Sequence, residues 1–201
     1  LEINPGFFAS HMGISNNLIY LNRYNEAIKN SNSAYDIAKN DGERRFALFT
    51  NVVAYVDSGS TDAAMKEMEN GYSLAKNIND AGAMSGDLTI MGNILFEAGR
   101  YEEAKAKFTE ALSVVESSDL SEEVKENNRR LNLYNMGRIS LMAGKFEEAK
   151  KMADEFNMKS TAANNTFQIW LAHQLNGLIA LQKKDYKKAI SEFENSDLQN
   201  P

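Results

Sequence analysis

The 201-residue chain contains no cysteine and only two prolines, and no apolar run in it is long. The absence of cysteine excludes a disulfide scaffold, a thiol nucleophile and a zinc-thiolate site. No apolar stretch approaches the roughly 20 residues that a helix needs to cross a bilayer, so we expect no membrane span. The chain begins with Leu1 rather than Met, so no targeting signal is readable, and the cytoplasm is only slightly favoured over the periplasm.

Positive charge is also scarce. The chain has 22 Lys and Arg against 28 Asp and Glu, a net charge of −6, which disfavours nucleic acid and anionic membrane surfaces as partners. Its two histidines, His11 and His173, have no companion at metal-binding spacing, and packing or hydrogen bonding is the favoured interpretation of both. We therefore predict no metal and no cofactor.

The near absence of proline predicts an all-α fold. Pro5 and Pro201 are the only prolines, so everything between them is free of the residue that most strongly interrupts helices. Alternating β-branched and polar residues, the mark of half-buried strands, are also rare.

An internal repeat is present. A six-residue motif that ends in alanine recurs along the chain, and four of its five copies have an aromatic residue at the third position. The alanines that end the copies lie 37, 40, 45 and 40 residues apart and are Ala27, Ala64, Ala104, Ala149 and Ala189. The copies are Asn22–Ala27, Gly59–Ala64, Gly99–Ala104, Gly144–Ala149 and Lys184–Ala189. Such a period is typical of stacked helical hairpins.

A second marker describes the hairpin. Gly92, Gly137 and Gly177 each lie 12 residues before a repeat alanine. The constant spacing predicts two helices that cross closely where glycine faces alanine, with the aromatic residue after the turn filling the wedge. Gly99 and Gly144 suit the left-handed position that ends a helix. Ser121, followed by two glutamates, predicts the N-cap of a long helix that runs to about Ala143.

These residues resemble the tetratricopeptide repeat (TPR) pattern of glycine, aromatic, alanine, aromatic, alanine and proline. The third repeat matches it with Gly92, Tyr101, Ala104, Phe108 and Ala111, and the fifth with Gly177, Tyr186, Ala189, Phe193 and Pro201. The resemblance implies an all-α, right-handed superhelical solenoid of antiparallel helix pairs. The excess over the family period of about 34 residues predicts longer helices rather than long loops.

The repeat phase predicts one TPR-like array over residues 1–201, with repeats at about 6–41, 42–80, 81–118, 119–160 and 161–201. Pro5 and Pro201 both stand where the family closes a repeat, which indicates a segment excised from a longer protein. Exposed array ends would then allow a dimer as well as a monomer.

In the resembling family the first helix of each repeat lines a concave face that binds extended or helical peptides. Carried over by phase, the predicted peptide-binding residues are Met12, Asn16, Tyr20, Phe49, Thr89, Asn93, Tyr134, Arg138 and Gln174, with Val53 and Leu178 beside them. Some members hold a peptide carboxylate with a lysine one turn before an asparagine. Met12 and Thr89 occupy the lysine positions here, so we predict asparagine contacts to a peptide backbone instead.

No catalytic constellation emerges, and we predict a non-enzymatic chain. Two functions stay open. One is a scaffold that binds a protein or peptide along its concave face. The other is a ligand- or peptide-sensing regulatory segment of a larger bacterial protein.

Overall fold

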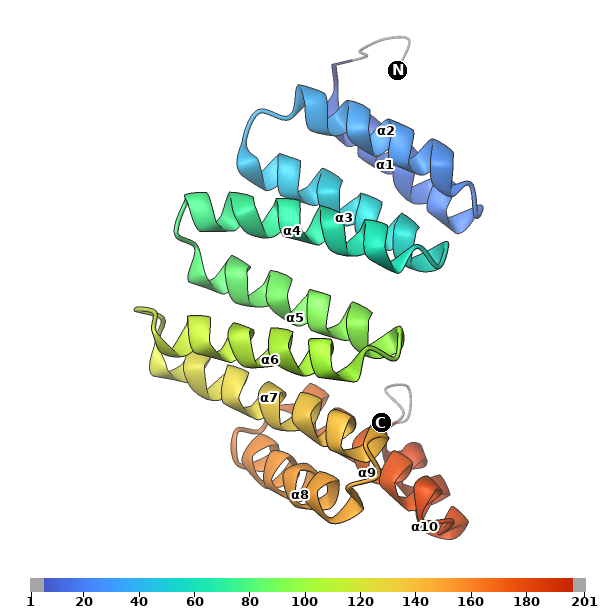
Figure 1. Ribbon diagram of the computed structural model, residues 1–201, viewed down its shortest axis with the longest axis vertical. Helices are drawn as coiled ribbons and strands as arrows, with labels where there is room; N and C mark the ends of the chain where they lie inside the picture. The colour runs from blue at the N-terminus through green and yellow to red at the C-terminus, as the bar shows by residue number, and fades with distance from the viewer. Residues whose placement is uncertain (1–5, 197–201) are drawn as a thin grey trace. The chain divides into compact units, whose positions relative to one another are not determined.

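A computed structural model describes residues 6–196, which form ten α-helices and contain no strand (Figure 1). The all-α prediction is confirmed. The helices are α1 (Phe8–Tyr20), α2 (Tyr24–Ile37), α3 (Asp41–Asp57), α4 (Thr61–Asn77), α5 (Ala81–Glu97), α6 (Tyr101–Glu116), α7 (Glu122–Met142), α8 (Phe146–Ala162), α9 (Thr166–Gln182) and α10 (Tyr186–Asn195). Pro5 and Pro201, on which the prediction of an excised segment depends, lie outside the described residues.

The chain divides into two compact units, unit 1 up to Arg100 and unit 2 from Tyr101 onward. In unit 1 each helix packs on the next, from α1 to α5, and α1 also contacts α3. In unit 2 the same pattern runs from α6 to α10, and α7 also contacts α9. Within each unit, short connections between successive helices give antiparallel hairpins. The third expected repeat contributes α5 to unit 1 and α6 to unit 2, and the single continuous array stays a prediction.

The predicted start of the longest helix is confirmed. The Ser121 hydroxyl caps α7 by accepting a hydrogen bond from the Val124 N–H at 3.4 Å, and the helix runs for 21 residues to Met142. Glu122 and Glu123 occupy its first turn, where the positive end of the helix dipole favours carboxylates. Most of the other helices have 16 or 17 residues. The extra length of the repeats therefore lies in helices, as predicted.

Left-handed residues end the first helix of each hairpin. Gly99 and Gly144 have φ angles of 75° and 72°, which confirms their predicted position. At Gly144 the chain closes with hydrogen bonds from its N–H to the Leu141 carbonyl and from the Lys145 N–H to the Ser140 carbonyl. Lys184 adopts the same conformation, with φ of 59°, although its side chain makes the left-handed region costly by about 1 kcal/mol.

Gly137 and Gly177 are positions of close approach, and a large side chain is the nearest neighbour of each. A Cβ on Gly137 would lie 3.7 Å from the Ala149 carbonyl, as expected, yet its nearest contact would be Leu175 Cδ2 at 2.9 Å. A Cβ on Gly177 would meet the ring of Phe193 first, at 2.6 Å. The space left by glycine is therefore filled by a large side chain from α9 or α10.

Candidate functional site

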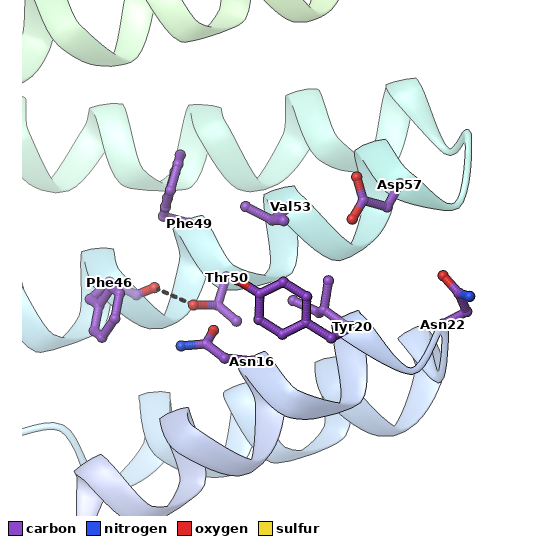
Figure 2. Close-up of a pocket in the computed structure, with 9 residues that line it drawn as sticks. Asn16, Tyr20, Asn22, Phe46, Phe49, Thr50, Val53 and Asp57 are labelled. Atoms are coloured by element: carbon purple, nitrogen blue, oxygen red, sulfur yellow. Dashed lines mark hydrogen bonds between the residues drawn. The ribbon is translucent and has the colours of Figure 1, made fainter. Parts of the chain in front are cut away.

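Unit 1 carries an open pocket of about 480 Å³ on the face formed by α1 and α3 (Figure 2). Its lining residues are Asn16, Ile19, Tyr20, Asn22, Phe46, Phe49, Thr50, Val53 and Asp57. Asn16, Tyr20 and Phe49 come from the predicted peptide-binding set, and Val53 was placed beside it. The structure brings these four residues together around one hollow.

Aromatic side chains form the exposed part of the pocket. Tyr20 is 87% exposed, Phe46 47% and Phe49 42%. Thr50 lies buried between them, and its hydroxyl donates a hydrogen bond to the Phe46 carbonyl oxygen at 3.1 Å (Figure 2). The pocket therefore exposes apolar surface to water, and the Thr50 hydroxyl at its base already has a hydrogen-bond partner.

A packed core supports this wall. Ile19, which lines the pocket, is buried in a cluster with Leu18, Ala27 and Ala54, and Val53 packs against the same cluster. These contacts fix the facing turns of α1 and α3, so the pocket is held open by rigid elements rather than by loops.

Met12 does not lie on the open face, and its predicted groove position is wrong. Its side chain is 3% exposed and is buried with Ala34 and Ala47, with Phe8 packed against them. The reason is local. Met12 is on the second turn of α1, where α2 and α3 both approach. The repeat position that is exposed at Phe49 on α3 is therefore buried at Met12.

The electrostatics of the pocket are simple. Among its lining residues Asp57 is the only one that carries a formal charge. Neither α1 nor α3 has a basic residue in its last turn. Asn22 lines the same end of the pocket, and its side-chain oxygen accepts a hydrogen bond from the Tyr24 hydroxyl at 2.7 Å.

The predicted residues of α5 are not part of this pocket. Thr89 is half-buried, and its hydroxyl donates to the Ser85 carbonyl within the helix at 2.9 Å. Asn93 follows one turn later and is also half-buried. Their assignment to a peptide-binding face stays a prediction.

Unit 2 brings three other predicted residues together. The Tyr134 hydroxyl on α7 donates to Gln174 Oε1 on α9 at 2.9 Å. The Arg138 guanidinium lies 5.4 Å from the centre of the Tyr134 ring, in cation–π geometry. The same ring lies 5.5 Å from the ring of Phe156. This cluster is satisfied internally, in contrast with the open pocket of unit 1.

Sequence reasoning missed five lining residues: Ile19, Asn22, Phe46, Thr50 and Asp57. The signal was present on α3, since Phe46 precedes Phe49 by three residues and Asp57 follows Val53 by four, which places them on one helical face. The prediction used only two or three positions of each repeat and passed over the neighbouring turns.

Unit 1 also contains a buried ion pair. Arg45 Nη2 on α3 lies 2.8 Å from Asp87 Oδ1 on α5. Burial raises the pKa of the Asp87 carboxyl to about 6, against the opposing effect of Arg45, and Asp80 adds a smaller increase. Asp87 Oδ2 and Arg45 Nη1 have no hydrogen-bond partner in the described structure. This pair lies outside the pocket and bridges two helices.

No protein-family model matches the chain, and no curated protein matches it. Solved structures do match. Aspartyl phosphate phosphatase F from Bacillus subtilis superposes with a TM-score of 0.68 at 14% identity, covering 96% of this chain and 61% of that one. A Rap protein complexed with competence and sporulation factor gives 0.64 at 11% identity, covering 92% and 61%. TPR-like repeats of a Podosopora anserina putative kinesin light chain give 0.65 at 11% identity, covering 96% and 94%.

These likenesses show the fold, which is that of TPR-like helical hairpin repeats. The chain spans about three fifths of the length of the first two structures. Such repeats commonly serve as binding scaffolds, because stacked hairpins present extended surfaces. Within residues 6–196 no helix is both long enough and apolar enough to cross a membrane.

Proposed function

We propose that the chain is a binding module whose α1–α3 pocket holds an extended or helical peptide segment of a partner protein. The observation that carries the proposal is the exposed aromatic wall of the pocket, in which Tyr20, Phe46 and Phe49 surround a hollow of about 480 Å³. Exposed aromatic side chains on a rigid, concave surface are the usual anchors of protein recognition.

Asn16 supplies the polar half of the proposed recognition. It is exposed at the pocket, and its amide makes no hydrogen bond to the described part of the chain. An amide offers both donors and an acceptor, so it can pair with the backbone of a bound peptide while Tyr20 and Phe49 contact its side chains. Thr89, Asn93, Tyr134, Arg138 and Gln174 remain proposed as further contact residues.

The proposed role is binding without turnover. Asp57 is the only charged residue among those that line the pocket, and no histidine or second carboxylate lies beside it to form an acid–base pair. One structural neighbour carries the name of a phosphatase, and that activity is not part of the proposal.

The proposal is tested with a displayed library of random 12-residue peptides selected on the full 201-residue chain. We expect the enriched peptides to lose most of their affinity, about 30-fold or more, for a Y20A/F49A double variant. I78A is the matched control, because Ile78 is 57% exposed in the same unit but lies outside the pocket. Peptides that bind the double variant as well as wild type would refute the proposal.

A second candidate is a peptide-sensing regulatory segment of a larger protein. It is favoured by the likeness to the Rap protein solved with competence and sporulation factor, of which the chain spans 61%. A sensing segment changes conformation when it binds, whereas a passive scaffold does not. Small-angle scattering of the full chain with and without a selected peptide separates them. A radius of gyration that changes by more than about 1 Å supports sensing, and an unchanged value supports the scaffold.

A further inference from the structure

The pocket of unit 1 has two chemically different ends. Figure 2 shows Phe46 and Asn16 toward one end and Asp57 with Asn22 toward the other, with Tyr20 and Val53 between them. One end therefore offers aromatic surface and a neutral amide. The other end offers a carboxylate beside the turns that close the first and second hairpins.

The negative charge of this end comes from Asp57. Asp57 makes no ion pair and no side-chain hydrogen bond with any other part of residues 6–196. Both α1 and α3 end here without a basic residue in the last turn. Because α2 and α4 begin four residues later, their positive N-terminal ends offset the two negative C-terminal ends, and the carboxylate remains as the source of charge.

The basic residue that follows Asn22 in the chain does not neutralise this end. Arg23, the N-cap residue of α2, forms a two-pronged pair with Glu26 at 2.7 and 2.6 Å. The two charges cancel each other, and this pairing holds the pKa of the Glu26 carboxyl below its usual range. The unpaired Asp57 carboxylate thus sets the local charge of the pocket.

We propose that the occupant of this pocket is a peptide segment that presents a large apolar side chain to Tyr20 and Phe49 and a lysine or arginine to Asp57. The proposal rests on the proposed binding function and narrows its ligand class. The cationic side chain meets the Asp57 carboxylate, and its aliphatic stem lies along the apolar wall. The exposed Tyr20 ring adds a cation–π surface, which favours arginine in particular.

Acidic segments are disfavoured by the same arrangement. A glutamate at this end would face Asp57 without any compensating cation from the pocket lining. The net charge of −6 adds a weaker, long-range repulsion of acidic partners and attraction of basic ones. The pocket therefore selects by sign of charge as well as by apolar contact.

The test selects the random 12-residue library separately on wild type, D57N and D36N, each as the full 201-residue chain. Asp36 is an exposed carboxylate on α2 that is absent from the pocket lining, so D36N changes the net charge equally at another place. We expect lysine and arginine to be enriched in the wild-type and D36N pools but not in the D57N pool. The best wild-type peptide should bind D57N about three- to tenfold more weakly and D36N within about twofold.

A charge-reversed variant sharpens the test. D57K should shift the enriched pool toward aspartate and glutamate, because the same position now carries a cation. Asp57 is exposed at a helix C-terminus, where removing a negative charge does not destabilise the helix, so both variants should fold. The composition of the wild-type pool tests the inference even without them.

The outcomes separate the two proposals. Pools that depend on Tyr20 and Phe49 but show no basic enrichment overturn the charge preference and leave the binding function standing. Pools that do not depend on Tyr20 and Phe49, or no enrichment at all, overturn both. Basic enrichment that persists in the D57N pool assigns the preference elsewhere and also overturns the inference.

Discussion

Arg45 in unit 1 and Arg130 in unit 2 occupy the same place in the repeat, seven residues before the glycine marker position, yet they meet different acceptors. Arg45 pairs with the Asp87 carboxylate at 2.8 Å and so links α3 to α5. Arg130 Nε donates to Gln168 Oε1, also at 2.8 Å, and links α7 to α9. The repeat places an arginine at the same position in both units. The side chain that accepts its hydrogen bond, a carboxylate or an amide, determines whether the pair titrates.

The two bridges also differ in how completely they are satisfied. Gln168 uses both ends of its amide, since its Nε2 donates to Asn127 Oδ1 at 2.9 Å. Asp87 leaves its second oxygen without a partner among the described residues. The Arg130–Gln168 bridge of unit 2 is the more complete network, and the Arg45–Asp87 ion pair of unit 1 is the more sensitive to pH.

The largest expected effect comes from breaking the Arg130–Gln168 bridge of unit 2. Q168L should lower the free energy of unfolding by about 4 kcal/mol, because Gln168 is 2% exposed and its loss removes a hydrogen-bond partner from both Arg130 and Asn127, which keep only a 3.3 Å bond to each other. D87L should cost less, about 2 kcal/mol, because the Arg45 side chain retains some access to water. Urea unfolding of both variants measures the difference. Equal losses would break the comparison.

The next prediction compares Tyr134 and Phe49, the aromatic residues that lie three residues before the glycine marker position of their repeats. Y134A should lower the free energy of unfolding by about 3 kcal/mol, since Tyr134 contacts Phe156 and Gln174. F49A should cost at most about 1 kcal/mol, because Phe49 is 42% exposed at the pocket. The same urea series measures both. A cost for F49A that matches Y134A would show that Phe49 is a core residue rather than a binding surface.

A smaller effect concerns pH. Because burial raises the pKa of Asp87 from 3.8 to about 6, the folded state binds this proton more tightly than the unfolded state does. The contribution of Asp87 to stability therefore falls as pH rises from about 4 to about 6 and is constant above that window. We expect the free energy of unfolding of wild type, relative to D87N, to drop by about 2 kcal/mol across it.

The control for the pH prediction is unit 2, where the amide of Gln168 does not titrate. The difference between wild type and Q168L should stay constant over the same window. A wild-type advantage over D87N that grows with pH would reverse the sign and contradict the burial argument.

The smallest effect lies at the marker glycines of unit 2. G177A should cost about 1 kcal/mol, since the new Cβ would meet the rigid ring of Phe193 at 2.6 Å. G137A should be nearly neutral, because its nearest contact is the end of the flexible Leu175 side chain at 2.9 Å and alanine favours the helix. Thermal unfolding ranks the two. The reverse order would show that Leu175 cannot move.

The local features of the fold were predictable from the sequence, because they depend on residues close together in the chain. The cap at Ser121 and the left-handed turns at Gly99 and Gly144 follow from such local chemistry. Contacts between distant residues were not predictable. Nothing in the repeat phase indicates that the nearest neighbour of Gly177 is Phe193, or that Arg45 reaches a carboxylate 42 residues away.

The candidate site was half predictable. The repeat position predicted Asn16, Tyr20 and Phe49 as pocket residues. It did not predict the burial of Met12, which lies where three helices meet. Asp57, the charged residue among those that line the pocket, lies at the end of α3, beyond the positions that were compared between repeats. Its position beside the end of α1 depends on how two hairpins pack, which periodicity alone does not specify.

Hydrogen exchange of the full chain, with and without a peptide selected from the library, tests the central claim most directly. The account predicts slower exchange in the turns of α1 and α3 that carry Tyr20 and Phe49, in the wild type but not in Y20A/F49A. Protection confined to helices other than α1 and α3, or equal protection in the double variant, would contradict it.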